Sequence, residues 1–375
     1  MKPIKVLHIV SVETENYYLN NLTDYTDSKD VEFSFVTFAG KCEFGVELEK
    51  RGKHVYYLDC LSRNRYPQAF LKLWKILKTE NPDIVHTHLF DPSVIGLMVA
   101  KWQNRKTVLT RHHSDALYQI TSAAKRKFYL GLENYINRKS DHIIAPSYAV
   151  RDILVEKENV PPEKVTRIPY GQTSERFEAV TQEKIENVRA ELDMKRNLSL
   201  VCVSRLFHRK GHQYLFEAFA NLMKNGLDAT LYLVGEGNYK ETLEKLAKDL
   251  EIENNVKFLG WRDDALVVIA ASDIVVHPSL EDALSSAIIE SLMLEKPIIA
   301  TDISGVRDSL DDGKYGDIVA PADTESFRLA LHKTIENLEA ARIKAKAGRK
   351  YLLEYMDAKR VADEYKLIYQ NLLEV

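Results

Sequence analysis

Short apolar segments rich in β-branched residues alternate with helical segments through the second half of the chain. Each apolar segment is followed by a loop and then by a stretch with helical periodicity. The predicted strands are Leu198–Val203, Ala229–Val234, Val256–Leu259, Asp273–Val276, Pro297–Ala300 and Asp317–Val319. This alternation is typical of a parallel sheet with helices on both faces.

The first half of the chain shows the same alternation. Its predicted strands are Ile4–Val10, Glu32–Phe38, His54–Leu58, Asp83–His88, Thr107–Arg111, His142–Pro146 and Val165–Pro169. A polar, charged segment without a strand pattern, residues 173–197, separates the two series. We therefore predict an α/β protein of two Rossmann-like, doubly wound domains facing a cleft, residues 1–175 and 176–356. The helical residues 357–375 are expected to pack back on the first domain.

Composition limits the classes of protein to consider. The chain has 375 residues, which favours two domains over a single core. Its 52 basic and 55 acidic side chains give a net charge of −3, which argues against a general nucleic-acid binder. Three scattered cysteines lack metal-binding or redox spacing and fit a reduced, cytoplasmic setting. The first strand begins too early for a secretory signal, and no apolar run approaches ~18 residues, so we expect no membrane span.

Polar residues gather directly after the predicted strands, where ligands bind in open parallel sheets. Arg205 follows the first strand of the second domain, and Lys210 precedes the next helix. Cations beside a helix amino terminus would stabilise the negative charge that develops on a departing diphosphate. The alternative is two ordinary surface cations. With Gly235 and Gly237 after the next strand, these residues predict a pocket for a nucleoside diphosphate.

Two acidic positions follow the strand Asp273–Val276. Glu290 lies among apolar residues of the predicted helix Ser286–Leu294, where its carboxylate could accept both hydroxyls of a ribose. Asp282, with Glu281 beside it, lies before that helix. It could contact the substrate or simply cap the helix.

Histidines mark two strands of the first domain. His112 and His113 follow Thr107–Arg111, and a histidine there can donate a hydrogen bond to a sugar hydroxyl or a phosphate. His86 and His88 alternate along a strand, and we expect them to face opposite sides of it, with one packed in the core. No carboxylate pair or histidine cluster has convincing metal-binding spacing, so we expect no metal.

A basic and aromatic stretch occupies residues 124–132 and includes Lys125, Arg126 and Lys127. On a helix these cations could touch an anionic membrane, with the protein peripheral on the inner face. The alternative is a solvated face over a buried stripe from Phe128 to Leu132.

The order of these motifs resembles the retaining, GT-B-fold glycosyltransferases of family four, also called glycosyltransferase group 1. That family's Arg…Lys-Gly phosphate loop is similar to VSRLFHRKG, and its glycine turn is similar to LVGEG. Its Gly-Gly-x-Pro-Glu…Gly-x-Leu-Val-x-Pro region resembles ISGVRDSLDDGKYGDIVAPAD. The segment that closes its N-terminal domain resembles SDHIIAPSYAVRDILV…VPPEKVTRIPYG. The resemblance covers almost the whole chain, and the order is specific although each motif alone is weak.

The resemblance implies roles for individual residues. Cations and helix amides would hold the donor diphosphate, a carboxylate would hold the ribose, and glycines would let the backbone approach the base. The residues concerned are Arg205, Lys210, Ala287 and Ile288 for the diphosphate, Glu290 for the ribose, Gly235 and Gly237 for the base, and His112 and Asp282 for the donor sugar.

We therefore expect a hexosyltransferase-type enzyme of polysaccharide biosynthesis that retains the anomeric configuration. Its donor would be a UDP- or GDP-linked sugar, and its acceptor a glycan or a lipid-linked molecule, with no separate cofactor. The chain has Val12-Glu13 where the family has Gly-Gly. Where the family has the first of two glutamates, it has Asp282, or Glu281 if the loop carries one extra residue. These differences leave two alternatives open: a non-catalytic glycosyltransferase-like binding subunit, and a sugar-nucleotide epimerase on the same fold.

Overall fold

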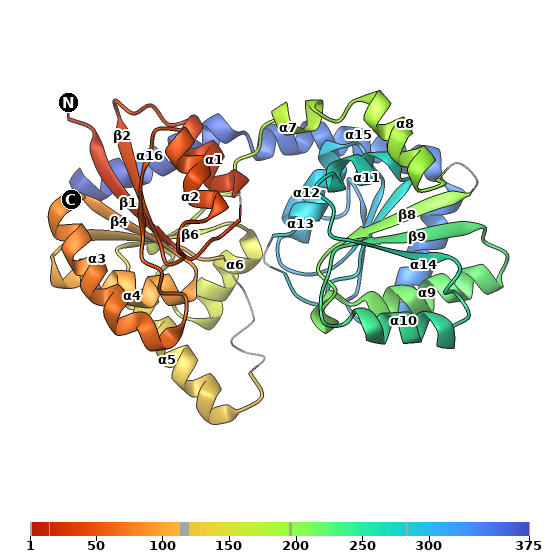
Figure 1. Cartoon of the computed structure of the whole chain (residues 1–375), viewed down its shortest axis with the longest axis horizontal. Coiled ribbons are helices and arrows are strands. Elements are labelled where there is room, and N and C mark those ends of the chain that lie inside the picture. Colours follow the sequence, from red (N-terminus) through yellow and green to blue (C-terminus); the bar gives the residue numbers. More distant parts are fainter. Residues whose placement is uncertain (1, 15, 113–119, 195–196, 283, 375) are drawn as a thin grey trace. The chain divides into compact units, whose positions relative to one another are not determined.

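A computed structural model describes residues 2–374 except 15, 113–119, 195–196 and 283. The chain divides into two compact units (Figure 1). Unit 1 comprises Met1–Thr173 and Met356–Val375, and unit 2 comprises Ser174–Tyr355. The chain therefore leaves unit 1 once and returns to it with its last helix.

The described part of unit 1 contains a seven-stranded parallel sheet in the order β3-β2-β1-β4-β5-β6-β7. Its strands are β1 (Ile4–Val10), β2 (Val31–Thr37), β3 (His54–Tyr57), β4 (Ile84–His88), β5 (Lys106–Thr110), β6 (His142–Ala145) and β7 (Val165–Arg167). Strand β1 lies between β2 and β4, with Val6 opposite both Phe33 and Ile84. The strand order reverses there, and ligands bind at the carboxyl edge of such a switch point.

Helices cover both faces of this sheet, because successive residues of a strand point to opposite sides. Val6 of β1 joins a core cluster with residues of α1 and α16, whereas the next residue, Leu7, packs with residues of α3 and α4. The helices of unit 1 are α1 (Tyr17–Asp24), α2 (Glu43–Lys50), η1 (Arg63–Arg65), α3 (Tyr66–Glu80), α4 (Phe90–Trp102), α5 (Ala123–Lys139), α6 (Tyr148–Asp152), the π-helical η2 (Ile153–Lys157), η3 (Pro162–Lys164) and α16 (Ala358–Glu374).

The described part of unit 2 contains a six-stranded parallel sheet in the order β10-β9-β8-β11-β12-β13. Its strands are β8 (Leu198–Val203), β9 (Ala229–Val234), β10 (Val256–Gly260), β11 (Ile274–His277), β12 (Ile298–Thr301) and β13 (Asp317–Val319). Its helices are α7 (Glu175–Glu178), α8 (Gln182–Glu191), η4 (His208–Lys210), α9 (His212–Lys224), α10 (Lys240–Asp249), α11 (Ala265–Ala271), α12 (Ser286–Met293), α13 (Val306–Leu310), α14 (Thr324–Glu336) and α15 (Leu338–Tyr355). The switch point of this sheet lies between β8 and β11.

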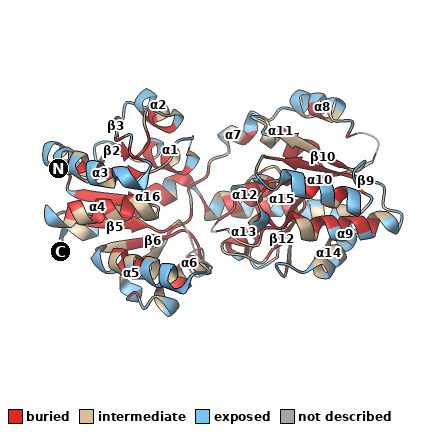
Figure 2. Cartoon of the chain, turned by 60° about the horizontal axis from the view of Figure 1, so that its bottom comes forward, coloured by how far each residue is buried: buried red, intermediate tan, exposed pale blue. Residues whose placement is uncertain are grey.

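Burial accounts for the character of the strand sequences (Figure 2). All six residues of β9 are buried, and so are all four residues of β11 and of β12. A strand covered on both faces is apolar at every position rather than at alternate positions. This is why the strands could be recognised as continuous apolar runs, and the predicted fold class of two doubly wound α/β domains is confirmed. Every predicted strand agrees with the structure to within two residues at each end.

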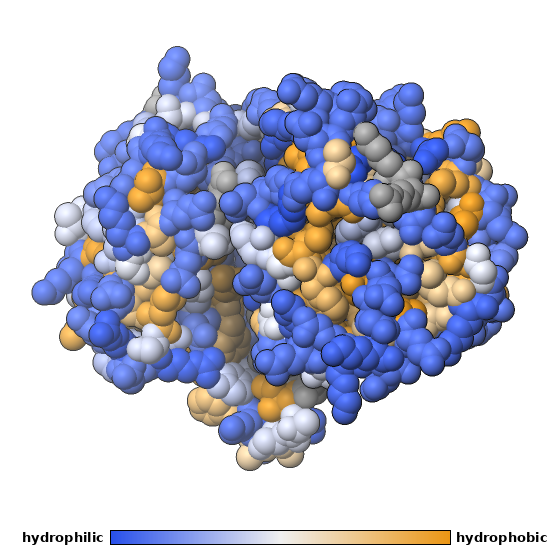
Figure 3. Space-filling view, turned by 45° about the vertical axis from the view of Figure 1, so that its right-hand side comes forward, coloured by the Kyte–Doolittle hydropathy of each residue, from blue (hydrophilic) through white to orange (hydrophobic). Residues whose placement is uncertain are grey.

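Helix α5 presents an unexpected surface. Phe128 is 64% exposed, so the alternative of a buried stripe beginning at Phe128 is wrong. Lys125 and Lys127 are exposed beside it. Hydrophilic side chains cover most of the molecular face seen in Figure 3, with hydrophobic ones in separate small groups. None of the described helices is both long and apolar enough to span a bilayer.

Candidate functional site

The loops at the carboxyl edge of the unit 2 sheet are joined to one another through their backbones. The loop after β8 donates a backbone hydrogen bond to the loop after β9 and accepts one from the loop after β11. Leu206 N donates to Glu236 O at 2.8 Å, in the loop after β9, and Leu280 N in the loop after β11 donates to Arg209 O at 2.9 Å. Three of the loops that sequence analysis singled out are therefore one connected structure.

Glycines make these close approaches between loops sterically feasible. A side chain at Gly211 would place its Cβ 1.9 Å from Pro278 O, and Gly211 has φ of +68°. A Cβ at Gly235, where φ is +136°, would lie 2.2 Å from Ser204 O. A Cβ at Gly237 would lie 2.1 Å from Leu206 O. The backbone that Gly235 and Gly237 approach in this structure is the loop after β8, and no other residue fits such contacts without moving it.

The two predicted cations have different surroundings. Lys210 is buried, and its ammonium donates to Asp282 Oδ2 at 2.6 Å. Arg205 is exposed, and its guanidinium carbon lies 5.1 Å from the ring centroid of Phe207, a cation–π contact. Lys210 is thus a fixed charge held by a carboxylate, whereas Arg205 lies at the surface of the same loop.

His277, at the end of β11, completes the surroundings of Lys210. Its Nε2 lies 4.0 Å from Asp282 Oδ2, and the side chain is 2% exposed. Burial lowers the pKa of His277 to about 4, with the Lys210 charge acting in the same direction and the Asp282 carboxylate opposing it. His277 is therefore neutral near pH 7, and Lys210 is the cation of this trio.

Helix α12 begins at the same edge of the sheet. Ala287 and Ile288 lie in its first turn, and Ser285 at the N-cap makes no side-chain hydrogen bond to it. The first amides of a helix have no partner within the helix and attract anions. Ala287 and Ile288 are therefore placed where an anion at this edge would meet backbone N–H groups.

Glu290 lies one turn further along α12 and is bound by a residue that sequence analysis missed. Its Oε1 accepts a hydrogen bond from Arg176 Nη2 at 3.1 Å, and both side chains are less than 20% exposed. Arg176 comes from α7, 114 positions earlier in the chain. The pairing orients the Glu290 carboxylate, and one of its oxygens is already engaged.

In unit 1, His112 is the second residue after β5, and both of its ring nitrogens are engaged. Nε2 lies 3.1 Å from His88 Nδ1, and Nδ1 lies 2.6 Å from Tyr170 Oη. Contact of His112 with a sugar hydroxyl through a ring nitrogen would require one of these bonds to open. The neighbouring His113 lies outside the described residues.

His86 and His88 lie on the same side of β4, so the expectation of opposite faces is wrong. Residues two apart on a strand share a face. Both are buried, and their rings stack with centroids 4.3 Å apart and planes 21° apart. His86 is bonded to Tyr369 Oη and to Thr110 Oγ1, each at 2.8 Å, so the C-terminal helix α16 reaches this cluster.

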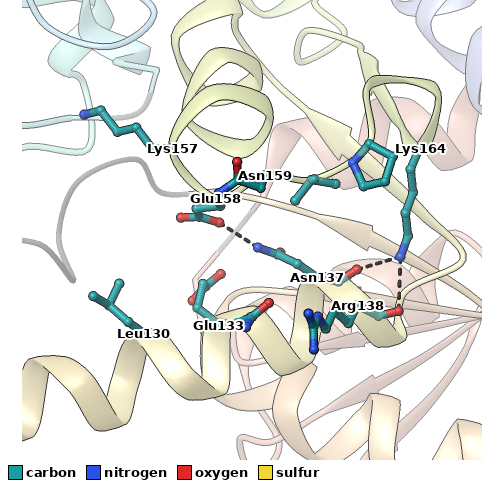
Figure 4. Close-up of a pocket in the computed structure, with 11 residues that line it drawn as sticks. Leu130, Glu133, Asn137, Arg138, Lys157, Glu158, Asn159 and Lys164 are labelled. Carbon is teal, nitrogen blue, oxygen red and sulfur yellow. Dashed lines mark hydrogen bonds between the residues drawn. The ribbon is translucent and has the colours of Figure 1, made fainter.

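Arg111, which precedes His112, is held by two buried carboxylates. Arg111 Nη1 lies 2.7 Å from Glu133 Oε1, and both Nη atoms donate to Glu158 at 2.9 Å. Asn137 Nδ2 donates to Glu158 Oε2 at 2.6 Å (Figure 4). The cluster borders a cavity of about 690 Å³ between α5 and residues 157–164. The cluster anchors the carboxyl end of β5, and His112 follows Arg111 there.

Comparison with solved structures identifies the fold. The crystal structure of Anabaena Alr3699/HepE in complex with UDP superposes with a TM-score of 0.82 at 20% identity, covering 99% of this chain and 100% of that one. The structure of WaaG, a glycosyltransferase involved in lipopolysaccharide biosynthesis, superposes with a TM-score of 0.74 at 16% identity, covering 98% of this chain and 99% of that one. Two doubly wound parallel domains of this kind define the GT-B fold.

Sequence comparison then identifies the family. Residues 184–351 match the family described as glycosyl transferases group 1, and residues 16–176 match glycosyltransferase family 4. The uncharacterized glycosyltransferase MJ1069 of Methanocaldococcus jannaschii is 27% identical, over 98% of this chain and 96% of its own. The UDP-Gal:alpha-D-GlcNAc-diphosphoundecaprenol alpha-1,3-galactosyltransferase of Escherichia coli is 26% identical, over 85% of this chain and 84% of its own. The chain belongs to the group 1, family 4 glycosyltransferases, and it is an enzyme of that class.

Proposed function

We propose that this glycosyltransferase moves a hexose from a uridine- or guanosine-diphosphate donor to a hydroxyl of a glycan or lipid-linked acceptor, with retention of the anomeric configuration. The observation that carries the proposal is the buried Lys210 at the switch-point edge of unit 2, joined through its loop to the turn that leads into α12. A nucleotide donor is supported by the UDP bound to the Anabaena protein and by the UDP-galactose named for the Escherichia coli relative.

Lys210 and the first amides of α12 would stabilise the departing diphosphate. Negative charge grows on the phosphate oxygens as the glycosidic bond to the donor breaks, and a fixed cation and fixed N–H groups lower the energy of that state. Arg205 would reach the same group from the surface of the loop. The remainder of the catalysis is positioning of the acceptor hydroxyl.

Retention is proposed because the acceptor can attack from the face that the diphosphate leaves. The leaving diphosphate oxygen can then receive the acceptor's proton, so no enzyme nucleophile is needed. A double displacement of the glycosidase kind would need two carboxylates about 5 Å apart on either side of the anomeric carbon. At this edge Asp282 is engaged by Lys210, and Glu290 by Arg176.

The test is release of nucleoside diphosphate from a panel of UDP- and GDP-sugars by the purified full-length protein, with and without candidate acceptors. Lys210→Ala should lower the rate by roughly 100-fold or more. Lys257→Ala, a substitution at an exposed lysine of β10, is the control. NMR of the product's anomeric proton reports retention. Conversion of the donor into another nucleotide sugar, with no acceptor present and no net release of diphosphate, would indicate the epimerase. Absence of turnover with every donor would indicate the binding subunit.

A peripheral membrane contact through α5 is part of the same proposal. Lys125, Arg126 and Lys127 precede the 64% exposed Phe128. Each basic side chain near an anionic bilayer contributes about 1 kcal/mol, and Phe128 adds apolar contact. The full-length protein should sediment with phosphatidylglycerol vesicles at low salt. Replacement of the three cations by glutamine should abolish this, whereas equal binding by the variant would contradict it.

A further inference from the structure

Four side chains of unit 1 form an unbroken line of hydrogen bonds from the core to the carboxyl edge. His8 Nδ1 lies 2.9 Å from His88 Nε2, and His88 Nδ1 lies 3.1 Å from His112 Nε2. His112 Nδ1 lies 2.6 Å from Tyr170 Oη. His8 and His88 are at most 2% exposed. Strands β1 and β4 and the segment after β5 each supply a histidine, so the line runs across the switch point of the sheet.

The line ends inside the protein. His8 Nε2 is buried and has no hydrogen-bond partner among the described residues. Burial lowers the pKa of His8 to about 3, and it holds the pKa of His88 well below its ordinary value, with the neighbouring histidines His86, His8 and His112 acting in the same direction. Both inner imidazoles therefore carry a single proton near pH 7.

If His112 is neutral as well, and each contact holds one proton, only two arrangements are self-consistent. In one, Tyr170 donates to His112, which donates to His88, which donates to His8; each ring then carries its proton on Nε2. In the other, every donor and acceptor is exchanged, and each ring carries its proton on Nδ1. Because the contacts are linked, the tautomer of one ring fixes those of the other two.

The geometry favours donation from Tyr170 inward. The 2.6 Å contact at Tyr170 fits an O–H donor better than an N–H donor, for which about 2.9–3.0 Å is usual. This arrangement also leaves all three rings in the Nε2–H form, which is the intrinsically more stable tautomer of neutral histidine. The His8 ring makes an edge-to-face contact with Phe33, centroids 5.0 Å apart, which allows an N–H···π contact at the buried end.

We propose that His88 is a positioning residue for His112. The line of hydrogen bonds from His8 holds His112 as the neutral Nε2–H tautomer, with its Nδ1 accepting from Tyr170. The inference rests on the proposed function only in its kinetic test, through the expectation that His112 contacts the donor sugar. A ring tied at both nitrogens is fixed in orientation, and misplacement of a group at a reacting centre by about 1 Å can cost 100-fold in rate.

The same histidines could be taken for a metal site, because nitrogens of His8, His86 and His88 lie within 4.8 Å of one another. An imidazole binds a metal through a lone pair in the plane of its ring. The ring planes of His8 and His88 are only 17° apart, and His8 Nδ1 and His88 Nε2 face each other at 2.9 Å, so the in-plane lone pair of this contact is directed at the other ring and not at a shared ion. The nitrogens of His86 and His88 are also already hydrogen-bonded.

The test is nitrogen-15 NMR of the full-length protein labelled at histidine, at pH 7.5, with His112 and His88 assigned from His112→Asn and His88→Phe. We expect the Nε2–H pattern at His112, unchanged by an equivalent of Zn²⁺. In His88→Phe, which keeps an aromatic ring but removes both ring nitrogens, the His112 signals should become an average of both tautomers. Observation of Nδ1–H or imidazolium at His112, or a zinc-induced shift at His8 and His88, would overturn the proposal.

Kinetics separates positioning from a purely structural role. His88→Phe should lower kcat about tenfold while the KM for the donor stays within about threefold, and His88→Asn, which keeps a polar group near the Nδ1 position, should recover most of kcat. The control is His142→Phe, because His142 lies in β6, bonds to Thr166 and is not part of the line of hydrogen bonds. Equal kcat in His88→Phe and wild type overturns the positioning role. If no donor is turned over at all, the proposed function fails while the tautomer measurement still decides this inference.

Discussion

The carboxylate of Glu290 accepts a hydrogen bond from the guanidinium of Arg176 at 3.1 Å, within unit 2. If Glu290 accepts the ribose hydroxyls, the hydrogen bond from Arg176 orients its carboxylate for that task. Glu290→Gln should then weaken nucleotide binding, because one acceptor oxygen becomes a donor and the charge is lost. The loss of affinity should be much smaller for a 2′,3′-dideoxy nucleotide, because that ligand has no ribose hydroxyls to donate to Glu290.

A thermodynamic cycle between the protein change and the ligand change measures this coupling. Calorimetric binding of the nucleoside diphosphate and of its dideoxy analogue to both proteins provides the four affinities. Glu295→Gln, at a partly exposed ion pair with Arg349, is the matched control. A coupling free energy indistinguishable from zero would mean that Glu290 does not contact the ribose.

Activity should survive chelation by EDTA. Lys210, with Arg205 and the α12 amides, can stabilise the negative charge of a diphosphate without a divalent ion. In the described part of the chain, the group of candidate metal ligands that geometry brings together is His8, His86 and His88, in unit 1. Turnover measured after dialysis against EDTA should equal that of untreated enzyme. Complete loss that manganese or magnesium restores would show a metal-dependent site.

Glu158→Ala should strongly destabilise the protein. It removes one of two carboxylates from the buried guanidinium of Arg111, and breaking a buried pair costs about 3–5 kcal/mol. Asp24→Ala, at a more exposed pair with Arg51, should cost about 1 kcal/mol or less. Urea unfolding of the two variants compares them directly. Similar midpoints would mean that the Arg111 cluster contributes no more than a surface pair.

Acid should destabilise the fold from about pH 6.5 downward. Burial lowers the pKa of His8 and of His212 to about 3 and that of His277 to about 4, below the 6.5 of an unfolded histidine. The unfolded state therefore binds more protons between pH 6.5 and those values, so stability is complete above 6.5 and falls as the pH drops through this window. Thermal midpoints that stay constant between pH 7 and pH 5 would contradict this.

The fold could be predicted because its information is local. Strand β8 was predicted with its observed bounds, Leu198–Val203, because a strand buried on both faces is a continuous apolar run between polar loops. The loop residues could be placed at one edge because parallel strands share their carboxyl side.

Side-chain partners could not be predicted, because they depend on tertiary contacts. Nothing near Glu290 in the sequence indicates Arg176, which lies 114 positions away. The shared face of His86 and His88 follows from their spacing of two along a strand, so the expectation that they face opposite sides was an error of periodicity. The exposure of Phe128 depends on which neighbouring elements pack against α5, and helical periodicity alone does not specify that.

The central claim is that unit 2 binds a nucleoside diphosphate through Lys210 beside the amino end of α12. The most direct measurement is thermal unfolding of wild type and Lys210→Ala across a panel of UDP, GDP and their sugars. At 100 times the dissociation constant, the correct ligand should stabilise the wild type by about 2.7 kcal/mol. The account predicts a concentration-dependent rise in Tm for the wild type and little or none for Lys210→Ala. No shift with any nucleotide, or the same shift in both proteins, would contradict it.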